Sequence, residues 1–261
     1  MRIDILTLFP AMVEPALATS MLGRARTRGL VDIRVVNLRD YAMGRHRVTD
    51  DYQFGGGTGM VLKPEPIFAA VEALRTAAAR VILMDPRGRT FTQARAAALA
   101  KEQHLILVAG RYEGVDERVG ELLADERLSI GDYVLTGGEL PALVVTDAVA
   151  RLLPGVLGGE GAAERESFAS GVLEPPQYTR PEDFRGARVP EVLLSGDHAR
   201  VARWRREQAL WLTWRRRPEL LGEASLTDEE RRLIERFERG ETPTAPAPTE
   251  RDESHGRDPD R

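Results

Sequence analysis

Apolar runs alternate with amphipathic stretches along the amino-terminal part of the chain. The runs are rich in β-branched and aliphatic residues, which predicts buried strands at residues 2–8, 31–36, 81–84 and 105–110. Between them, apolar residues recur near helical spacing, which predicts helices at residues 10–26, 64–78 and 92–101. Because strands and helices take turns along the chain, we predict an α/β fold whose sheet is mainly parallel.

The stretch Ser129–Pro141 joins β-type residues to glycines and then to a helical pattern. Its sequence predicts a strand, a tight turn at Gly137-Gly138, and a helix that begins at Glu139 and ends before Pro154. Glycine has no Cβ atom, so the pair leaves the backbone open to the close approach of a ligand such as a nucleotide. An ordinary strand-to-helix turn has the same kind of sequence. Further segments of this type are therefore needed to distinguish a ligand-binding turn from an ordinary one.

Two further predicted strands end in polar loops that contain glycine. Residues 105–110 lead into Arg111–Arg118, and residues 81–84 lead into the turn Asp85–Gly88. The carboxyl ends of parallel strands meet at one edge of a sheet, where α/β proteins bind ligands. The three loops together therefore predict a nucleotide-sized pocket at this edge.

The glycine-rich segment Arg45–Met60 lacks the periodicity of a helix or a strand. We predict a long loop, and long ordered loops are often functional. The run Gly55–Gly59 is not the glycine loop of a Rossmann methyltransferase or a P-loop, because no apolar strand precedes it and no Gly-Lys-Ser/Thr follows. A substrate lid and a structurally neutral loop both remain open.

Composition changes at about residue 158, and we predict a domain boundary there. Residues 1–157 form the predicted α/β domain. Residues 158–181, which are rich in glycine, acidic residues and proline, form a predicted interdomain linker. Residues 182–239 form a predicted small helical, basic domain. Residues 240–261 are rich in proline and acidic residues and are predicted to be disordered.

The basic character of the second domain is concentrated in one helix. Residues 200–217 contain seven arginines and one glutamate, in a chain whose net charge is −4. We expect Trp204, Trp211 and Trp214 to belong to the core, because their spacing suits one side of a helix. A solvated face would explain the arginines, but such an unbalanced run suits phosphate contacts better, so we predict nucleic-acid binding.

Composition also excludes several classes of site. The chain has no cysteine, which excludes disulfides and thiolate chemistry, and its four histidines are scattered, so we expect no zinc site. Its first residues lack the pattern of a signal peptide, and no apolar run is long enough to cross a bilayer. We therefore expect a cytoplasmic protein with no membrane partner.

Seven motifs, spread over residues 1–238, together resemble one known family. They are Phe54–Met60, Gly110–Asp116, Ser129–Glu139, Pro154–Gly158, Tyr178–Pro181, Leu193–Gly196 and Arg216–Leu221. In this order and spacing they are similar to the bacterial tRNA (guanine-N1)-methyltransferases, the TrmD family of the SPOUT class. The resemblance implies a deep trefoil knot in the first domain, which is a rare exception to unknotted topology, and a homodimer with the active site at the interface.

The resemblance also implies a reaction and its cofactor. Family members methylate N1 of the guanosine directly 3′ of the anticodon in tRNA, with S-adenosylmethionine as the methyl donor, and they also use Mg²⁺, whose ligands the sequence does not identify. By motif match, the residues implied for binding the cofactor are Leu83, Gly110, Glu113, Ser129, Ile130, Gly131, Asp132, Tyr133, Val134, Leu135, Gly137 and Gly138. Within the basic helix, Arg215, Arg216 and Arg217 are the residues expected to bind tRNA.

Two catalytic residues follow from the same resemblance. Glu166 falls where the family has an aspartate general base, so the carboxylate is kept on a side chain one methylene longer. Arg151 matches the family's arginine that stabilises charge on the guanine O6. A second departure is Thr58, which replaces the family's usual proline in the glycine-rich loop.

Two other functions compete with this one. An RNA-binding protein that has lost the activity would explain the change at Glu166, although retention of every cofactor motif argues against it. A knotted methyltransferase that acts on another RNA is disfavoured by the Tyr178–Pro181 segment and by the basic second domain.

Overall fold

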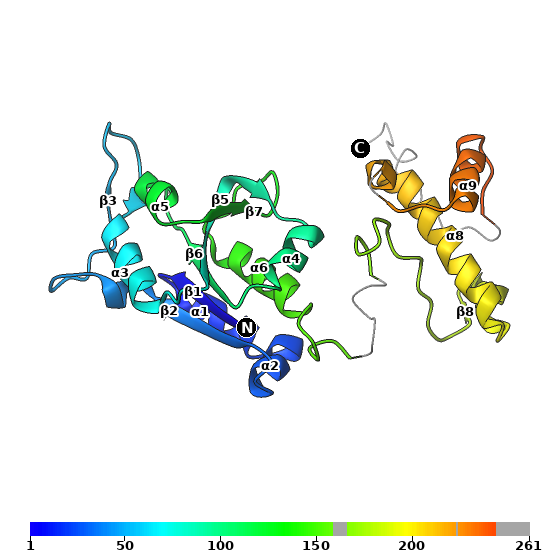
Figure 1. The fold of residues 1–261 in the computed structure, drawn as a ribbon, viewed down its shortest axis with the longest axis horizontal. Coiled ribbons are helices and arrows are strands. Elements are labelled where there is room, and N and C mark those ends of the chain that lie inside the picture. The colour runs from blue at the N-terminus through cyan, green and yellow to red at the C-terminus, as the bar shows by residue number, and fades with distance from the viewer. Residues whose placement is uncertain (159–165, 223, 244–261) are drawn as a thin grey trace, which may run out of the picture. The chain divides into compact units, whose positions relative to one another are not determined.

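The structure is a computed structural model that describes residues 1–158, 166–222 and 224–243. The chain divides into two compact units, Met1–Ala163 and Glu164–Arg261 (Figure 1). Residues 159–165 of the predicted linker and residues 244–261 of the predicted tail lie outside the described residues.

The first unit is built on a five-stranded sheet with the strand order β2-β1-β6-β5-β7. Every neighbouring pair in this sheet is parallel, which confirms the predicted α/β class. Its strands are β1 (Arg2–Thr7), β2 (Asp32–Asn37), β5 (Ala79–Thr90), β6 (His104–Ala109) and β7 (Glu126–Ser129). The central strand β6 is buried along its whole length. A strand with both faces covered has a continuous apolar sequence, which is why the pattern predicts it well.

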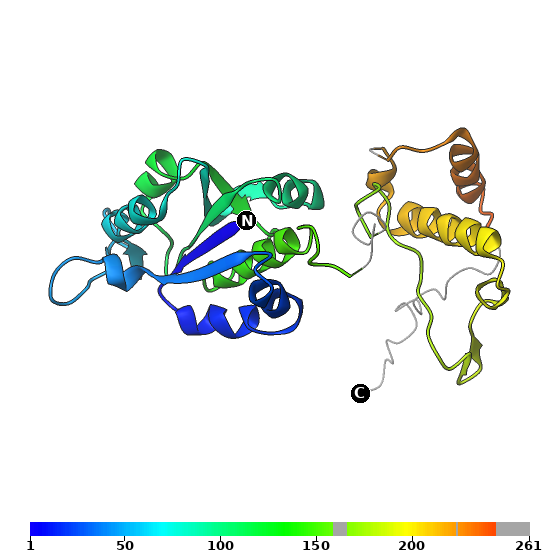
Figure 2. The same cartoon turned by 60° about the horizontal axis from the view of Figure 1, so that its bottom comes forward.

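Helices cover both faces of this sheet (Figure 2). They are α1 (Pro10–Leu17), α2 (Ser20–Thr27), α3 (Pro64–Leu74), α4 (Gln93–Leu99), α5 (Glu117–Leu122) and α6 (Glu139–Ala150), with a 3₁₀ turn at Leu38–Tyr41. Alternate residues of β6 enter two separate cores. Leu105 and Leu107 pack in the core that includes residues of α1, α2, α4 and α6, whereas Ile106 and Val108 pack in the core that includes residues of α3 and α5.

The predicted helix at residues 10–26 is wrong in one respect, because it is two helices. Thr19 is extended and Ser20 has a φ of 53°, so the chain turns between α1 and α2. The turn is tight: a Cβ atom on Gly23 would lie 2.4 Å from the carbonyl oxygen of Ala18. Both helices keep a buried apolar side, so the hydrophobic spacing alone did not reveal the break.

The strand predicted at the start of Ser129–Pro141 is also displaced. The strand is β7, which ends at Ser129, and residues 130–138 form a loop before α6. Val134 in this loop is 85 % exposed. The β-type residues after Gly131 are therefore not strand residues, and several of them face the cavity described below.

Two further predictions about loops need correction. The turn predicted at Asp85–Gly88 is a bulge within β5, which resumes its pairing with β7 at Arg89. The loop predicted at residues 45–60 contains most of an antiparallel hairpin, β3 (Asp50–Tyr52) and β4 (Met60–Leu62). Strands of three residues are too short to give a periodic pattern.

The second unit is mainly helical, as predicted, with a short hairpin that the sequence did not reveal. Its elements are β8 (Asp183–Phe184), β9 (Ala187–Arg188), α7 (Glu191–Leu194), α8 (His198–Arg216), a 3₁₀ turn (Pro218–Gly222) and α9 (Asp228–Glu238). Trp204 and Trp211 are buried, and Trp214 packs against the same core as Trp211 and Phe237, which confirms that the tryptophans are core residues.

The first four residues of the predicted tail belong to the described part of the chain. Residues 240–243 are described and make contacts: the Arg236 guanidinium donates to the Glu241 carboxylate at 2.7 Å, and Pro243 is buried. Across the described residues, no helix is both long enough and apolar enough to cross a membrane.

Candidate active site

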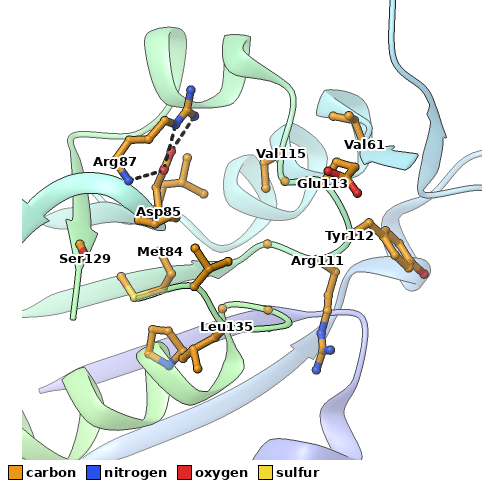
Figure 3. Close-up of a pocket in the computed structure, with 18 of the residues that line it drawn as sticks. Val61, Met84, Asp85, Arg87, Arg111, Tyr112, Glu113, Val115, Ser129 and Leu135 are labelled. Carbon is orange, nitrogen blue, oxygen red and sulfur yellow. Dashed lines mark hydrogen bonds and ion pairs between the residues drawn. The ribbon is translucent and has the colours of Figure 1, made fainter. Parts of the chain in front are cut away.

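A cavity of about 720 Å³ is lined by the bulge within β5 and by the loops that follow β6 and β7 (Figure 3). These are the segments at which the sequence predicts a nucleotide-sized pocket, and the volume is within the usual range of small-molecule sites. Among its lining residues are Leu83, Gly110, Glu113, Ser129, Ile130, Gly131, Tyr133, Val134, Leu135, Gly137 and Gly138. The structure therefore gathers all the expected cofactor residues around one cavity except Asp132, which does not line it.

Gly138, one of the lining residues, also packs tightly against β6. Its N–H donates to the carbonyl oxygen of Gly110 at 2.8 Å, which joins the start of α6 to the end of β6. A Cβ atom on Gly138 would lie 2.7 Å from Cα of Ala109 and 2.8 Å from N of Gly110. The missing side chain therefore makes room for the backbone of β6, and the role of Gly138 in cofactor binding stays a prediction.

A buried carboxylate connects the elements around this junction. Glu139, the first residue of α6, is 1 % exposed. It accepts a hydrogen bond from the Thr7 hydroxyl at 2.7 Å and one from Nε of Arg111 at 2.9 Å. A carboxylate at a helix N-terminus also interacts favourably with the helix dipole. Glu139 thus connects the end of β1, the loop after β6 and the start of α6.

Arg111 extends this connection to α1. Its guanidinium donates to the carbonyl oxygen of Thr136 at 3.2 Å and lies 4.7 Å from the centre of the Phe9 ring. Such a cation–π contact adds to the ion pair with Glu139. One side chain therefore fixes the loop after β6 against the loop before α6, and both loops line the cavity.

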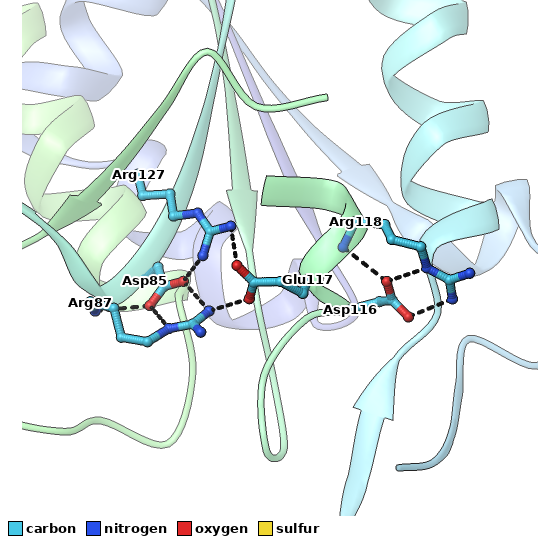
Figure 4. A network of polar contacts seen from close by, with 6 residues as sticks. All are labelled: Asp85, Arg87, Asp116, Glu117, Arg118 and Arg127. Carbon is cyan, nitrogen blue, oxygen red and sulfur yellow. Dashed lines mark hydrogen bonds and ion pairs between the residues drawn. The ribbon is translucent and has the colours of Figure 1, made fainter. Parts of the chain in front are cut away.

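A second network of charges forms another wall of the cavity (Figure 4). The Asp85 carboxylate, 8 % exposed, accepts hydrogen bonds from Arg87 at 2.7 Å and from Arg127 at 3.5 Å. Both arginines also contact Glu117 in the first turn of α5, Arg87 at 3.0 Å and Arg127 at 2.5 Å. The network holds the β5 bulge against α5 and β7.

The ion pairs in this network shift the pKa values of its carboxyl groups. Burial raises the pKa of Asp85, but hydrogen bonds and charge from Arg87, together with the charge of Arg127, outweigh it, and the pKa lies below its ordinary value. Hydrogen bonds from Arg127 and Arg87 likewise lower the pKa of Glu117. Both groups are therefore ionised at neutral pH.

The remaining predicted site residues lie away from the cavity or in the other unit. Arg151 caps the carboxyl end of α6 and does not line the cavity. Because α6 has twelve residues, that end is about 18 Å from the end that borders the cavity. Glu166 belongs to the second unit and borders a separate hollow there with Arg180 and Arg205.

The three arginines predicted to bind tRNA lie together at the end of α8 and are exposed. Nε of Arg217 donates to Glu219 at 2.5 Å, and the same guanidinium lies 5.8 Å from the centre of the Phe168 ring. Arg217 therefore also has a structural role at the end of the helix.

Sequence reasoning missed several lining residues. They are Gln53, Phe54, Val61, Met84, Asp85, Pro86, Arg87, Arg111, Tyr112, Gly114, Val115, Asp116, Glu117, Leu128 and Pro141. Many of them lie in the polar loops that the sequence predicts at the cavity edge, although none was named there as a single cofactor residue. Val61 of β4 carries no such signal, because only the fold brings this strand to the cavity.

Comparison with known proteins identifies the family. The sequence profile of the tRNA (guanine-1)-methyltransferase TrmD family matches residues 1–223. The chain belongs to this family. It is 56 % identical over 250 residues to the tRNA (guanine-N(1)-)-methyltransferase of Moorella thermoacetica, covering 94 % of this chain and 100 % of that protein. It is 58 % identical over 241 residues to the enzyme of the same name from Symbiobacterium thermophilum, covering 90 % and 97 %.

Membership makes the chain a methyltransferase and implies S-adenosylmethionine as the methyl donor. The cavity fits this ligand in size, and its lining combines apolar side chains such as Leu83 and Ile130 with the free backbone of glycine loops. Within the described residues there is no group of three or more His, Cys, Asp or Glu side chains that could hold a metal ion.

Proposed function

We propose that this protein transfers a methyl group from S-adenosylmethionine to N1 of the guanosine directly 3′ of the anticodon in tRNA. The observation that carries the proposal is the cavity at the edge of the parallel sheet, whose lining contains nearly the whole set of residues expected to bind the cofactor. The family match supports the class of reaction. The position of the guanosine rests on the resemblance described above.

The cofactor would be held by the bulge within β5 and by the loops after β6 and β7. S-adenosylmethionine supplies a methyl group already activated by its sulfonium charge. Leu83, Ile130 and Leu135 offer an apolar surface for an aromatic base, and Glu113 offers a carboxylate for polar groups or positive charge. Family members use Mg²⁺, but we assign it no ligands in this chain.

The substrate nitrogen needs a base, because guanine N1 carries a proton at neutral pH and is a poor nucleophile until that proton leaves. We propose that the Glu166 carboxylate accepts this proton. Negative charge then develops on the guanine O6, and the Arg151 guanidinium stabilises it.

The position of Arg151 supports an active site made by two copies of the chain. Arg151 lies at the opposite end of α6 from the cavity of its own chain, so a partner's Arg151 is the better candidate. Apolar side chains are exposed on the neighbouring helices α1 and α6: Met12 is 45 % exposed, Leu140 50 % and Val144 45 %. A homodimer that covers this surface would bury them.

We also propose the trefoil knot of the family for the first unit, and the domain arrangement predicted from the sequence. The knot rests on the family resemblance, and two local contacts agree with it: β5 pairs with β7 on both sides of its bulge, and the N–H of Gly138 donates to the carbonyl oxygen of Gly110. Residues 1–157 would bind the cofactor, residues 158–181 would carry the base, and residues 182–239 would bind tRNA. The cytoplasmic location stays a prediction.

Replacement of Glu166 by glutamine tests the mechanism. Glu166→Gln keeps nearly the same shape but removes the proton acceptor, so single-turnover methyl transfer should fall by at least ~100-fold. Binding of S-adenosylmethionine and tRNA should persist. Glu166→Asp, which restores the family's residue, should stay active. The control is Glu174→Gln, an exposed carboxylate of the same segment that accepts from the Gln177 side chain, and it should be fully active.

Two outcomes would contradict the proposal in different ways. Wild-type rates for Glu166→Gln would show that the proton goes to another group, while the reaction itself could stand. A wild-type protein that binds tRNA but transfers no methyl group would instead support an RNA-binding protein without activity. Methylation of ribosomal RNA but not of tRNA would support the other alternative.

A further inference from the structure

Besides Tyr133, which is one of the expected cofactor residues, three large aromatic side chains are exposed beside the cavity. Tyr52 is 80 % exposed, Phe54 102 % and Tyr112 48 %. Phe54 and Tyr112 line the cavity at the same time, and Tyr112 is seen at its border in Figure 3. Aromatic residues usually bury most of their surface in a folded protein, so three exposed rings at one site call for a partner.

The backbone brings the loop of Tyr112 next to the hairpin of Tyr52 and Phe54, although these two segments are far apart in sequence. Tyr52 of β3 pairs with Met60 of β4, and the carbonyl oxygen of Met60 accepts a hydrogen bond from the N–H of Glu113 at 3.0 Å. Leu62 of β4 continues this pairing with Gly114 and Asp116. The hairpin that carries Tyr52 and Phe54 is therefore fixed beside the loop that carries Tyr112.

The local conformation keeps the rings outward. Tyr112 has a φ of 62°, an unfavourable value for a residue with a side chain, so its presentation is maintained by the surrounding hydrogen bonds. After Phe54, the turn runs through Gly55, Gly56 and Gly57, whose φ values are 88°, 80° and 129°. In the described part of the chain, none of the three rings makes an aromatic or cation–π contact, so their faces are available.

The charges nearby favour one kind of contact. Asp50 and Asp51 belong to the same hairpin as Tyr52, and negative charge this close repels phosphates. Nucleic-acid bases are different, because they are uncharged and stack on aromatic rings whatever their sequence. A surface that combines aromatic rings with carboxylates therefore favours stacking of unpaired bases over contacts with the phosphate backbone.

We infer that Tyr52, Phe54 and Tyr112 form a stacking surface for unpaired bases of the tRNA next to the guanosine that is methylated. The inference rests on the proposed function, which brings a single-stranded tRNA loop to this cavity. The arginines of α8 would hold the phosphates, and the three rings would hold the neighbouring bases while the target base enters the cavity.

Binding of tRNA at several salt concentrations tests the inference. Tyr52→Ala should raise the Kd for tRNA by between about 5-fold and 150-fold, the range of one base–aromatic stack. The slope of log Kd against log salt should stay unchanged, because that slope depends on the number of phosphates that the protein binds. Phe54→Ala should behave alike. Tyr52→Phe, which keeps the ring, should bind as the wild type does.

Matched controls separate stacking from damage to the fold. Met43 is 88 % exposed in the preceding segment and has no ring, so Met43→Ala should leave tRNA binding unchanged. Tyr52 does not line the cavity, so Tyr52→Ala should keep wild-type affinity for S-adenosylmethionine in a calorimetric titration. A 2-aminopurine placed beside the target guanosine should lose fluorescence on binding wild type, and less so on binding Tyr52→Ala or Phe54→Ala.

The outcomes distinguish this inference from the proposed function. Wild-type tRNA affinity in both Tyr52→Ala and Phe54→Ala would overturn the stacking surface. Methylation of tRNA by the wild type would still leave the proposed function in place. A lower molecular mass of Tyr52→Ala in sedimentation would show that a second copy covers the rings, and would also overturn it. If the wild type methylates no tRNA, the proposed function fails, and the binding measurements still decide the stacking surface.

Discussion

Gly138 shows at the scale of one residue how a missing side chain can join two elements. The sequence suggested that this glycine lets a ligand approach the backbone. In the structure its Cβ position faces the backbone of Ala109 and Gly110. Backbone atoms cannot move aside as a flexible side chain can, so the close packing of α6 on β6 depends on glycine here.

A substitution at Gly138 should therefore reduce stability as well as binding. Gly138→Val should lower the free energy of unfolding by about 1–3 kcal/mol, the usual cost of overpacking, and should abolish calorimetric binding of S-adenosylmethionine because the cavity loops shift. Thermal unfolding and calorimetry measure the two effects. Gly158→Ala is the control, since a Cβ atom there meets nothing within 4 Å. Abolished binding by Gly138→Val at unchanged stability would restore the ligand-approach explanation.

At the scale of elements, Asp85, Arg87, Glu117 and Arg127 connect the β5 bulge, α5 and β7. Arg87 and Arg127 each contact both carboxylates, and the Arg127 guanidinium also passes where a side chain on Gly120 would stand. The pKa values of Asp85 and Glu117 lie below their ordinary values. Lowered pKa values mean that the network stabilises the fold above the unfolded-state pKa values and loses this contribution as pH falls through the folded-state values.

The lowered pKa values of Asp85 and Glu117 predict how the stability of the fold depends on pH. Arg127→Gln should lower the melting temperature at pH 7, and the difference from wild type should shrink below about pH 4 as both carboxyl groups become protonated. Thermal unfolding of both proteins between pH 3 and pH 8 measures this difference in melting temperature. The range is chosen because it brackets the ordinary carboxyl pKa values of about 4. Arg24→Gln, which removes a cation without an ion-pair partner among the described residues, should show no such trend. A difference that grows at acid pH would contradict the assignment.

The carboxyl end of α8 gives the second prediction at this scale. Changing Arg215, Arg216 and Arg217 together to glutamine should weaken tRNA binding and reduce its salt slope, by about 0.7–0.9 for each phosphate that the variant no longer binds. Filter binding at several salt concentrations measures both. Arg34→Gln, which breaks an exposed ion pair with Asp32 in the first unit, serves as the control. An unchanged slope in the triple variant would make these arginines an ordinary solvated face.

At the scale of the whole molecule, the cavity and the proposed catalytic arginine of one chain lie at opposite ends of α6. Val144, midway along this helix and 45 % exposed, is part of the apolar surface that a dimer would cover. Val144→Glu should place a charge in the interface, so the variant should sediment as a monomer and lose methyl transfer. Ala97→Glu on the exposed side of α4 is the matched control. A dimeric, active Val144→Glu protein would place the interface elsewhere.

The sequence by itself determined four of the five parallel strands, most helices and most of the loops that line the cavity. Buried strands such as β6 have apolar runs as their sequences, and glycines mark the places where strands end, so both signals are local. The family motifs added the residues of the cofactor site because they lie in these same loops.

Only the tertiary structure decided how distant residues meet. Thr7 and Glu139 are 132 positions apart and Asp85 and Arg127 are 42 apart, yet both pairs share hydrogen bonds. The reason that Gly138 must be glycine, the break between α1 and α2, and the hairpin that presents Tyr52 and Phe54 likewise depend on packing between elements. Periodicity reports only whether a position is buried, whereas the identity of its partner depends on the path of the whole chain.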